Sequence, residues 1–314
     1  MCPESEISHS TSTFTRLEPN ALARRSEVLA ARYADCDLCA HDCDVDRTAG
    51  EIGACAVDDT LHVSDYHPHH GEEAVLSGWN GSGTIFLTYC SLACVFCQNW
   101  EIAIEGQGRP VSPDDMAGMM LELQENGCHN INFVTPTHFT PGIVEALAIA
   151  REEGLDLPIV WNTGGYERAE VIRELDGVID IYMPDVKWAD DDAAARYSKA
   201  PKYWETNRKS LKEMYRQVGD LQIDGDGLAT QGVLVRHLVM PGYVENAKLI
   251  LDFIHQEISP DTYVNIMGQY TPYYKAASED RYDEINRRVA QEEYREVVDY
   301  ARDLGLSGLE TDSV

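Results

Sequence analysis

Three cysteines, Cys90, Cys94 and Cys97, lie within eight residues in the spacing C-x3-C-x2-C. Because the spacers are this short, one loop can direct all three thiols toward the same small group of atoms. A [4Fe–4S] cubane has four irons, and each takes one terminal ligand, normally a cysteine thiolate. Three thiolates therefore leave one iron open for a ligand from outside the chain, which predicts a reactive iron–sulfur centre.

Spacing alone leaves other uses of these thiols open. Structural zinc takes four nitrogen or sulfur ligands, often from C-x2-C pairs separated by a longer gap. The nearest fourth candidate is not local in this sequence, which disfavours zinc. A thioredoxin-like use of Cys94 and Cys97 is disfavoured because Cys90 adds a third thiol.

The elements that would position these cysteines begin at residue 83. From there, short apolar runs alternate with amphipathic stretches, which is typical of repeated strand–helix units. The stretch 112–127 predicts a helix with Ser112 as N-cap and Gly127 as C-cap, and 140–154 repeats this pattern. Continuous apolar strands suit a parallel sheet buried on both faces, either an open sheet or a barrel. We expect six strands, at 83–89, 130–135, 157–162, 178–183, 232–240 and 262–268.

Unusual residues follow each predicted strand. In order, these groups are the cysteine loop, "TPTH", "NTGGY", "PDVK", "PGY" and "QYTPYY". The carboxyl ends of parallel strands carry the active site in barrels and open sheets alike. The sequence therefore predicts one functional edge that all six groups share.

These motifs resemble the radical S-adenosylmethionine (SAM) enzymes, whose C-x3-C-x-aromatic-C motif follows the first strand of a barrel. Phe96 fills the aromatic position. More closely, the chain resembles the stand-alone subgroup related to pyruvate formate-lyase-activating enzymes, and the likeness covers most of its length. The resemblance implies a partial (β/α)6 TIM-like barrel. Its segments include "CDLCAHDCDVDRTAGEIGACAV", "GSGTIFLTYCSLACVFCQNWEI", "NINFVTPTHFTP", "IVWNTGGYE", "DIYMPDVKW", "VRHLVMPG" and "MGQYTPYYKA".

The resemblance also implies an activity. SAM would chelate the open iron, an electron from the reduced cluster would break a C–S bond, and a 5′-deoxyadenosyl radical would take hydrogen from a substrate. The cofactor carries that chemistry, so we expect no catalytic side chain. One hypothesis is an activating enzyme that forms a glycyl radical on a partner protein. The alternatives are a radical SAM enzyme for another peptide or a small molecule, and a non-catalytic metal-binding or electron-transfer protein.

The resemblance assigns cofactor contacts to the strand ends. Phe96 would pack near adenine, and Cys90, Cys94 and Cys97 would hold the cluster. Where many relatives have a glycine-rich segment with a glutamate for the SAM amino group, this chain has no carboxylate. It has Asn132, Thr135 and Thr137 at that place.

Further contacts follow the later strands. Asn162 and Thr163 resemble ribose or carboxylate contacts of the family. Lys187 suits the SAM carboxylate, and Asp185 would hold Lys187 or help bind a monovalent cation. Arg236 is a second carboxylate candidate because its guanidinium can bind in a bidentate manner. The alternative for all five is an ion pair or polar strand end with a structural role.

A second set of cysteines lies nearer the N-terminus. Cys36, Cys39, Cys43 and Cys55 have the spacing C-x2-C-x3-C-x11-C, and four thiols can close a metal site. A small segment with little apolar content benefits from a metal. Zn²⁺ and a second Fe–S cluster both fit, and thiols without metal remain an alternative. The nearby "HPHHGEE" at 67–73 is interpreted as a polar loop or groove lining, because adjacent histidines rarely converge on one ion.

The net charge of the chain limits the kinds of molecule that it can bind. The chain has 54 acidic against 25 basic residues, a net charge of −29. Such a field repels phosphates and anionic lipid, so we expect neither nucleic-acid nor membrane partners. The acids indicate a salt-adapted surface, with a docking face for a basic partner as the alternative. We expect an electron donor such as ferredoxin or flavodoxin, and a protein substrate under the activating-enzyme hypothesis.

The sequence also predicts the location and the domain organisation. The N-terminus lacks a basic region followed by an apolar core, and cysteines in motif spacing suit a reducing cytoplasm. The expected parts are a polar tail and short helix at 1–30, a four-cysteine module at 31–74, the barrel at 75–285 and a C-terminal helix at 286–314.

Overall fold

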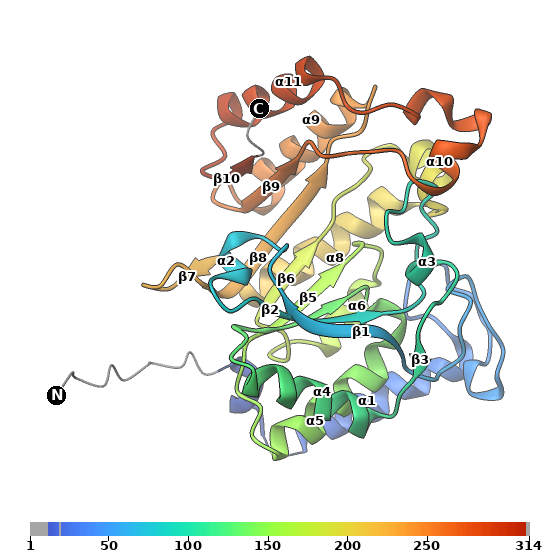
Figure 1. Cartoon of the computed structure of the whole chain (residues 1–314), viewed down its shortest axis with the longest axis vertical. Helices are drawn as coiled ribbons and strands as arrows, with labels where there is room; N and C mark the ends of the chain where they lie inside the picture. The colour runs from blue at the N-terminus through green and yellow to red at the C-terminus, as the bar shows by residue number, and fades with distance from the viewer. Residues whose placement is uncertain (1–11, 19, 312–314) are drawn as a thin grey trace.

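The computed structural model describes residues 12–18 and 20–311. One sheet dominates the molecule (Figure 1). Its parallel strands are β2 (Ser82–Leu87), β4 (Ile131–Val134), β5 (Ile159–Thr163), β6 (Ile181–Pro184), β8 (Ala229–Leu238), β9 (Tyr263–Met267) and β10 (Gly308–Thr311). The antiparallel strands are β1 (His62–His69), β3 (Arg109–Pro110) and β7 (Gln222–Ile223). All six predicted strands are present.

The strand order is β10-β9-β8-β6-β5-β4-β2-β1-β3, so within the described chain β10 and β3 form two separate ends. This parallel sheet with alternating helices does not close, and the predicted partial barrel is confirmed. Sequence reasoning did not find β1, β3, β7 and β10. β1 reads "HVSDYHPH", a largely polar stretch that lacks the apolar run of a strand buried on both faces.

Helices connect the parallel strands and cover the outside of the sheet (Figure 1). The longer helices are α1 (Ala21–Ala30), α4 (Pro113–Glu125), α5 (Thr140–Glu152), α6 (Ala169–Glu174), α8 (Tyr203–Val218), α9 (Val244–Phe253) and α11 (Gln291–Leu304). The short α-helices are α2 (Ala74–Ser77), α3 (Trp100–Ala103), α7 (Asp191–Ala193) and α10 (Tyr274–Ser278). Single 3-10 or π-helical turns lie at Thr13–Arg16, Ala31–Asp35, Arg47–Ala49, Thr137–Phe139, Ala194–Ser198, Ile254–Ile258 and Asp280–Ile285.

Helix α4 begins as predicted. The Ser112 hydroxyl accepts a hydrogen bond from the Asp115 N–H over 3.0 Å, and the Asp115 carboxylate accepts from the Ser112 N–H over 2.9 Å. This reciprocal pair is a capping box. Gly127 follows the helix with φ 80°, a left-handed conformation that glycine adopts without strain.

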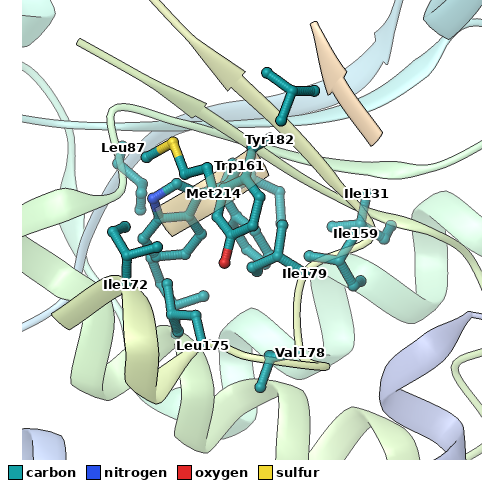
Figure 2. Packing of buried hydrophobic residues seen from close by; sticks show 14 of the residues in the cluster. Leu87, Ile131, Ile159, Trp161, Ile172, Leu175, Val178, Ile179, Tyr182 and Met214 are labelled. Carbon is teal, nitrogen blue, oxygen red and sulfur yellow. The ribbon is translucent and has the colours of Figure 1, made fainter. Parts of the chain in front are cut away.

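Both faces of the sheet are buried. Successive strand residues point to opposite faces, so Trp161 and Tyr182 pack on the helices while Val160 and Ile181 pack on the other side. Figure 2 shows Trp161 and Tyr182 beside Met214 of α8, with Ile172 and Leu175 of the α6 region close by. The opposite cluster contains Leu76, Val160, Ile181, Met183, Ala229 and Leu234. Leu76 of α2 thus packs against the inner face of the barrel.

The N-terminal segment, which precedes β2, packs against the sheet and the helices on its outer face. Ser12 and the Thr13 N–H donate to the Asp180 carboxylate over 2.5 and 2.7 Å, and Phe14 is buried. Cys36 and Cys55 belong to the same buried cluster as Trp161 and Tyr182, which point from the sheet toward the helices. Most of the expected polar tail, residues 1–11 and 19, lies outside the described residues. No helix in the described ranges combines the length and apolar character needed to cross a membrane.

Candidate cofactor site

The loop after β2 carries Cys90, Cys94 and Cys97. Two of its backbone N–H groups, those of Ala93 and Val95, donate to the carbonyls of Ser198 and Tyr197 over 3.1 and 2.8 Å. Both carbonyls belong to the π-helical turn Ala194–Ser198, which follows β6 and α7. The loop is therefore held by an element about a hundred residues away in the sequence.

The three thiols lie close enough to interact electrostatically, and Cys94 interacts with both others. Burial raises the pKa of each thiol, that of Cys97 to about 12, while the charge of Lys187 opposes the rise. The Leu92 N–H donates to Cys90 Sγ over 3.3 Å, and Cys94 Sγ lies 3.2 Å from Ser198 Oγ. The N–H donor and the nearby cation therefore offset part of the cost that burial imposes on thiolates here.

In the described ranges, no three His, Cys, Asp or Glu side chains are arranged to hold a metal ion. A four-iron cluster does not require its ligands to converge on one point, because each thiolate binds a different iron. Cys90, Cys94 and Cys97 border a cavity large enough for a further ligand. Their number, chemistry and placement therefore fit a [4Fe–4S] cluster with one open iron.

That cavity has a volume of about 670 Å³ and lies at the carboxyl ends of the parallel strands. Ten of the predicted residues line it: Cys90, Cys94, Phe96, Cys97, Thr135, Asn162, Thr163, Asp185, Lys187 and Arg236. Asn132 and Thr137 are not among its lining residues. Asn132 is buried within β4, and Thr137 donates to the Glu167 carboxylate over 2.8 Å.

A charged network forms one side of the cavity. Arg236 donates from Nε to Asp185 Oδ1 over 3.1 Å and from Nη2 to Asn162 Oδ1 over 2.6 Å, and Lys187 forms an ion pair with Asp185. Burial alone raises the pKa of Asp185, but the charges of Lys187 and Arg236 outweigh it and hold that pKa below its ordinary value. The network places the cations Lys187 and Arg236 on one wall of the cavity, and both of them pair with the Asp185 carboxylate.

Glu72 also lines the cavity, and sequence reasoning did not find it. It comes from the segment between β1 and α2, and its carboxylate lies 3.6 Å from Arg236 Nη1. Burial raises the pKa of Glu72, and Arg236 opposes the rise. Two neighbours in "HPHHGEE", His67 and His69, also line the cavity, and both belong to strand β1. The available signal was the pair of acids at the end of "HPHHGEE", between β1 and α2.

A second missed carboxylate, Glu167, lies behind the cavity wall. It is fully buried and accepts hydrogen bonds from Thr137 and Thr163. Burial raises the pKa of Glu167, and the two hydroxyls oppose this. Its backbone forms an isolated bridge with Cys39. Glu167 thus connects the N-terminal cysteine segment to a residue of the cavity wall.

The structure gathers the N-terminal cysteines. Cys39 interacts electrostatically with Cys36, Cys43 and Cys55, and burial raises the pKa of its thiol. Cys36, Cys39 and Cys55 are buried, and the Ala54 N–H donates to Cys43 Sγ over 3.4 Å. Four residues that span 20 positions of the sequence therefore form one cluster of thiols.

The chain is similar to a protein of known sequence and to several solved structures. An uncharacterized protein of Methanocaldococcus jannaschii (MJ0674) is 31% identical over 300 residues, covering 92% of this chain and 81% of that protein. Similar solved structures include a domain of a pyruvate-formate lyase-activating enzyme from Bacteroides vulgatus (14% identity, TM-score 0.36, 64% of this chain and 91% of that one). Streptococcus suis SuiB bound to S-adenosylmethionine is another (14% identity, TM-score 0.49, 72% and 48%).

The cysteine loop and most of the cavity lie in one region of the sequence. The family model of the Radical SAM superfamily matches residues 84–254, more than half of the chain. This region contains Cys90, Cys94, Cys97 and the strand ends from β4 to β8. The chain belongs to the radical SAM superfamily.

Proposed function

We propose that this enzyme holds a [4Fe–4S] cluster on Cys90, Cys94 and Cys97, binds SAM in the adjoining cavity, and acts on a peptide or protein substrate. Membership of the superfamily implies the cluster and SAM. The observation that carries the proposal is that the three thiols, the cations Lys187 and Arg236, and the carboxylate of Glu72 all line one cavity.

A [4Fe–4S] cluster held by Cys90, Cys94 and Cys97 would, when reduced, supply one electron for the cleavage of SAM. The side chains of the cavity bind and orient SAM. Lys187 and Arg236 offer N–H donors to its carboxylate, and Glu72 offers an acceptor to its amino group. Phe96 gives an apolar contact for adenine, while Asn162 and Thr163 give polar contacts for the ribose.

The preferred substrate is a glycine residue of a partner protein, by analogy with the activating enzymes that the sequence resembles. A cavity of about 670 Å³ must take SAM as well as the reacting group, which favours a narrow chain such as a peptide over a second bulky molecule. Another peptide or a small molecule is the alternative substrate. The electron donor would be a ferredoxin or flavodoxin.

The test is SAM cleavage under anaerobic conditions. The protein is reconstituted with iron and sulfide in molar KCl, reduced with dithionite and mixed with SAM, and 5′-deoxyadenosine is measured by mass spectrometry. We expect product from the wild type and from Cys128→Ala, whose buried thiol belongs to neither cysteine set, and none from Cys94→Ala. A fully loaded wild type that forms no product, with or without glycine-containing peptides, would contradict the proposal.

A second experiment addresses the substrate. Peptides deuterated at the glycine α-carbon are added to the same reaction, and deuterium is sought in 5′-deoxyadenosine. Transfer from glycine supports the activating-enzyme role. Transfer from another labelled position, or from a small molecule alone, favours the alternative substrate class.

A further inference from the structure

Arg47 lies inside the N-terminal cysteine cluster. Its side chain is 0% exposed. The guanidinium donates to the Asp58 carbonyl over 3.1 Å from Nε and 2.5 Å from Nη2, and to the His138 carbonyl over 2.8 Å from Nη1. Nη1 also lies 3.9 Å from Cys36 Sγ. The donors of Arg47 are thus satisfied, but only by neutral carbonyls and a sulfur.

The positive charge of Arg47 lacks a carboxylate partner. Among residues 12–18 and 20–311, no Asp or Glu oxygen lies within 4.0 Å of its guanidinium nitrogens. Its electrostatic neighbours are Tyr33, whose ring centroid is 4.4 Å away, the thiols of Cys36 and Cys55, and, beyond 4.0 Å, the carboxylate of Asp58. The buried Arg236, in contrast, has Asp185 beside it.

A buried charge is costly unless an opposite charge compensates for it, and arginine does not lose its proton in proteins. The Asp58 carboxylate also interacts with this charge, but it lies more than 4.0 Å from the guanidinium and is partly exposed. The buried groups beside Arg47 that become anionic when they bind a metal are the thiols of Cys36 and Cys55. Four adjacent thiolates repel one another, so they remain ionised together when a metal binds them and replaces their four protons. Four thiolates on Zn²⁺ carry a net charge of −2, and a [4Fe–4S] cluster held by four thiolates is also anionic.

We infer that Cys36, Cys39, Cys43 and Cys55 hold an anionic tetrathiolate metal centre, and that Arg47 is its buried counter-charge. Zinc and an iron–sulfur cluster share this chemistry. Zinc requires the four side chains to turn toward one point, whereas a cluster places them on separate irons. The inference concerns a site outside the SAM cavity and does not rest on the proposed function.

The cysteine cluster contacts the loop that follows β2. His41, between Cys39 and Cys43, donates from Nε2 to the Ser91 carbonyl over 2.8 Å. His138, whose carbonyl accepts from Arg47, donates from Nε2 to the Thr88 carbonyl over 2.9 Å. Thr88 and Ser91 stand on either side of Cys90. The tetrathiolate centre therefore helps to position the first ligand of the other cysteine set.

The metal is identified in a variant without the SAM cluster. The triple variant Cys90→Ser, Cys94→Ser, Cys97→Ser is purified anaerobically in molar KCl, and zinc, iron and sulfide are measured per chain. We expect about one zinc, or about four irons with matching sulfide. Visible absorption and a reduced-state EPR signal identify the cluster, and their absence beside bound zinc identifies zinc. A folded triple variant without either metal overturns the inference.

If the triple variant does not fold, the wild type gives the answer. Iron or zinc beyond the four irons of one cluster supports a second centre, provided that Cys36→Ser with Cys39→Ser removes the excess. A wild type that holds four irons and no zinc after anaerobic purification overturns the inference. Both experiments measure bound metal and not SAM cleavage. A protein that fails to cleave SAM can therefore still confirm or refute the second metal centre.

The counter-charge is tested by substitution. Arg47→Met keeps an unbranched apolar stem and removes the charge. Arg168→Met is the control because Arg168 lies nearby, is partly exposed and pairs with Asp42. We expect Arg47→Met to release metal to a chelator at least 10-fold faster than the wild type, and Arg168→Met to match the wild type. Arg47→Lys should retain metal better than Arg47→Met. Equal release from Arg47→Met and Arg168→Met, or equal release from the Met and Lys variants at position 47, refutes the role of Arg47.

Discussion

Arg236 on β8 donates a hydrogen bond to Asn162 on β5 over 2.6 Å, although 74 residues separate them in the sequence. Strand β6 lies between these two strands, and its terminal region contributes Asp185, which accepts from Arg236 over 3.1 Å. One guanidinium thus connects the carboxyl ends of three neighbouring strands. This arrangement fixes the position of a cation at the wall of the cavity.

Replacing Arg236 with lysine should weaken SAM binding by about 10- to 100-fold, because a single ammonium cannot contact Asn162, Asp185 and a bound carboxylate together. The measurement is equilibrium dialysis of labelled SAM against the reconstituted protein under anaerobic conditions. Arg216→Lys on the exposed side of α8 is the control, since Arg216 pairs with Asp176 and Glu213 away from the cavity. Unchanged affinity in Arg236→Lys would argue against a SAM contact.

The Glu72→Gln variant should bind SAM about 10-fold more weakly, because the charge that attracts the SAM amino group is lost. The same substitution should have little effect on an analogue of SAM that lacks the amino group. Comparison of the two ligands separates a direct contact from a general change of the cavity. If Glu72→Gln weakens both ligands equally, Glu72 has a structural role instead.

Acid should destabilise the protein partly through His237. This residue is buried, and burial lowers its pKa to about 4, while Nδ1–H donates to the Val186 carbonyl over 2.7 Å. Between pH 6.5 and 4 the unfolded chain takes up a proton that the folded chain does not. The free energy of unfolding then falls with decreasing pH, by about 1.4 kcal/mol per pH unit for this group.

The His237→Asn variant retains a side-chain N–H donor but cannot gain the proton. Urea unfolding in molar KCl at pH 7, 6 and 5 should therefore show a shallower decline for His237→Asn than for the wild type. The exposed His70 provides the matched control, and His70→Asn should keep the wild-type decline. Parallel pH profiles for all three proteins would show that His237 does not contribute.

Salt should stabilise the fold. With a net charge of −29, self-repulsion opposes compactness, and added ions screen it. We expect the free energy of unfolding to rise by at least about 1 kcal/mol between 0.1 and 2 M KCl. Urea titrations at several KCl concentrations measure this effect directly. A decrease in stability over that range would contradict the salt-adapted interpretation of the surface.

The order of apolar runs was sufficient to predict the parallel core. Strands such as β5, "IVWNT", are buried on both faces and therefore read as continuous apolar segments. Strand β1, which lies between β2 and the end strand β3, carries His62, His67, His69 and Asp65, so its polar sequence resembles a loop. Its position depends on pairing with β2 rather than on its own side chains, and single-sequence patterns do not contain that information.

The cavity was predictable where a residue lies at the end of a parallel strand, as Asn162 does, or just after it, as Asp185 and Lys187 do. Glu72 was not, because it precedes β2 and reaches the cavity only through the turn between β1 and α2. Arg47 was not distinguished from other arginines of the N-terminal segment. Its burial depends on contacts with Asp58 and His138, and His138 is 91 residues away.

The wide spread of the cavity residues along the chain has a consequence for synthesis. Cys97 precedes Tyr273, another lining residue, by 176 positions. At 5–20 residues per second, roughly 10 to 35 seconds pass between their appearance in a growing polypeptide. During that interval the thiols exist without the walls that later enclose them, and dioxygen or stray metals can reach them. Reducing conditions during synthesis would protect the thiols over this interval.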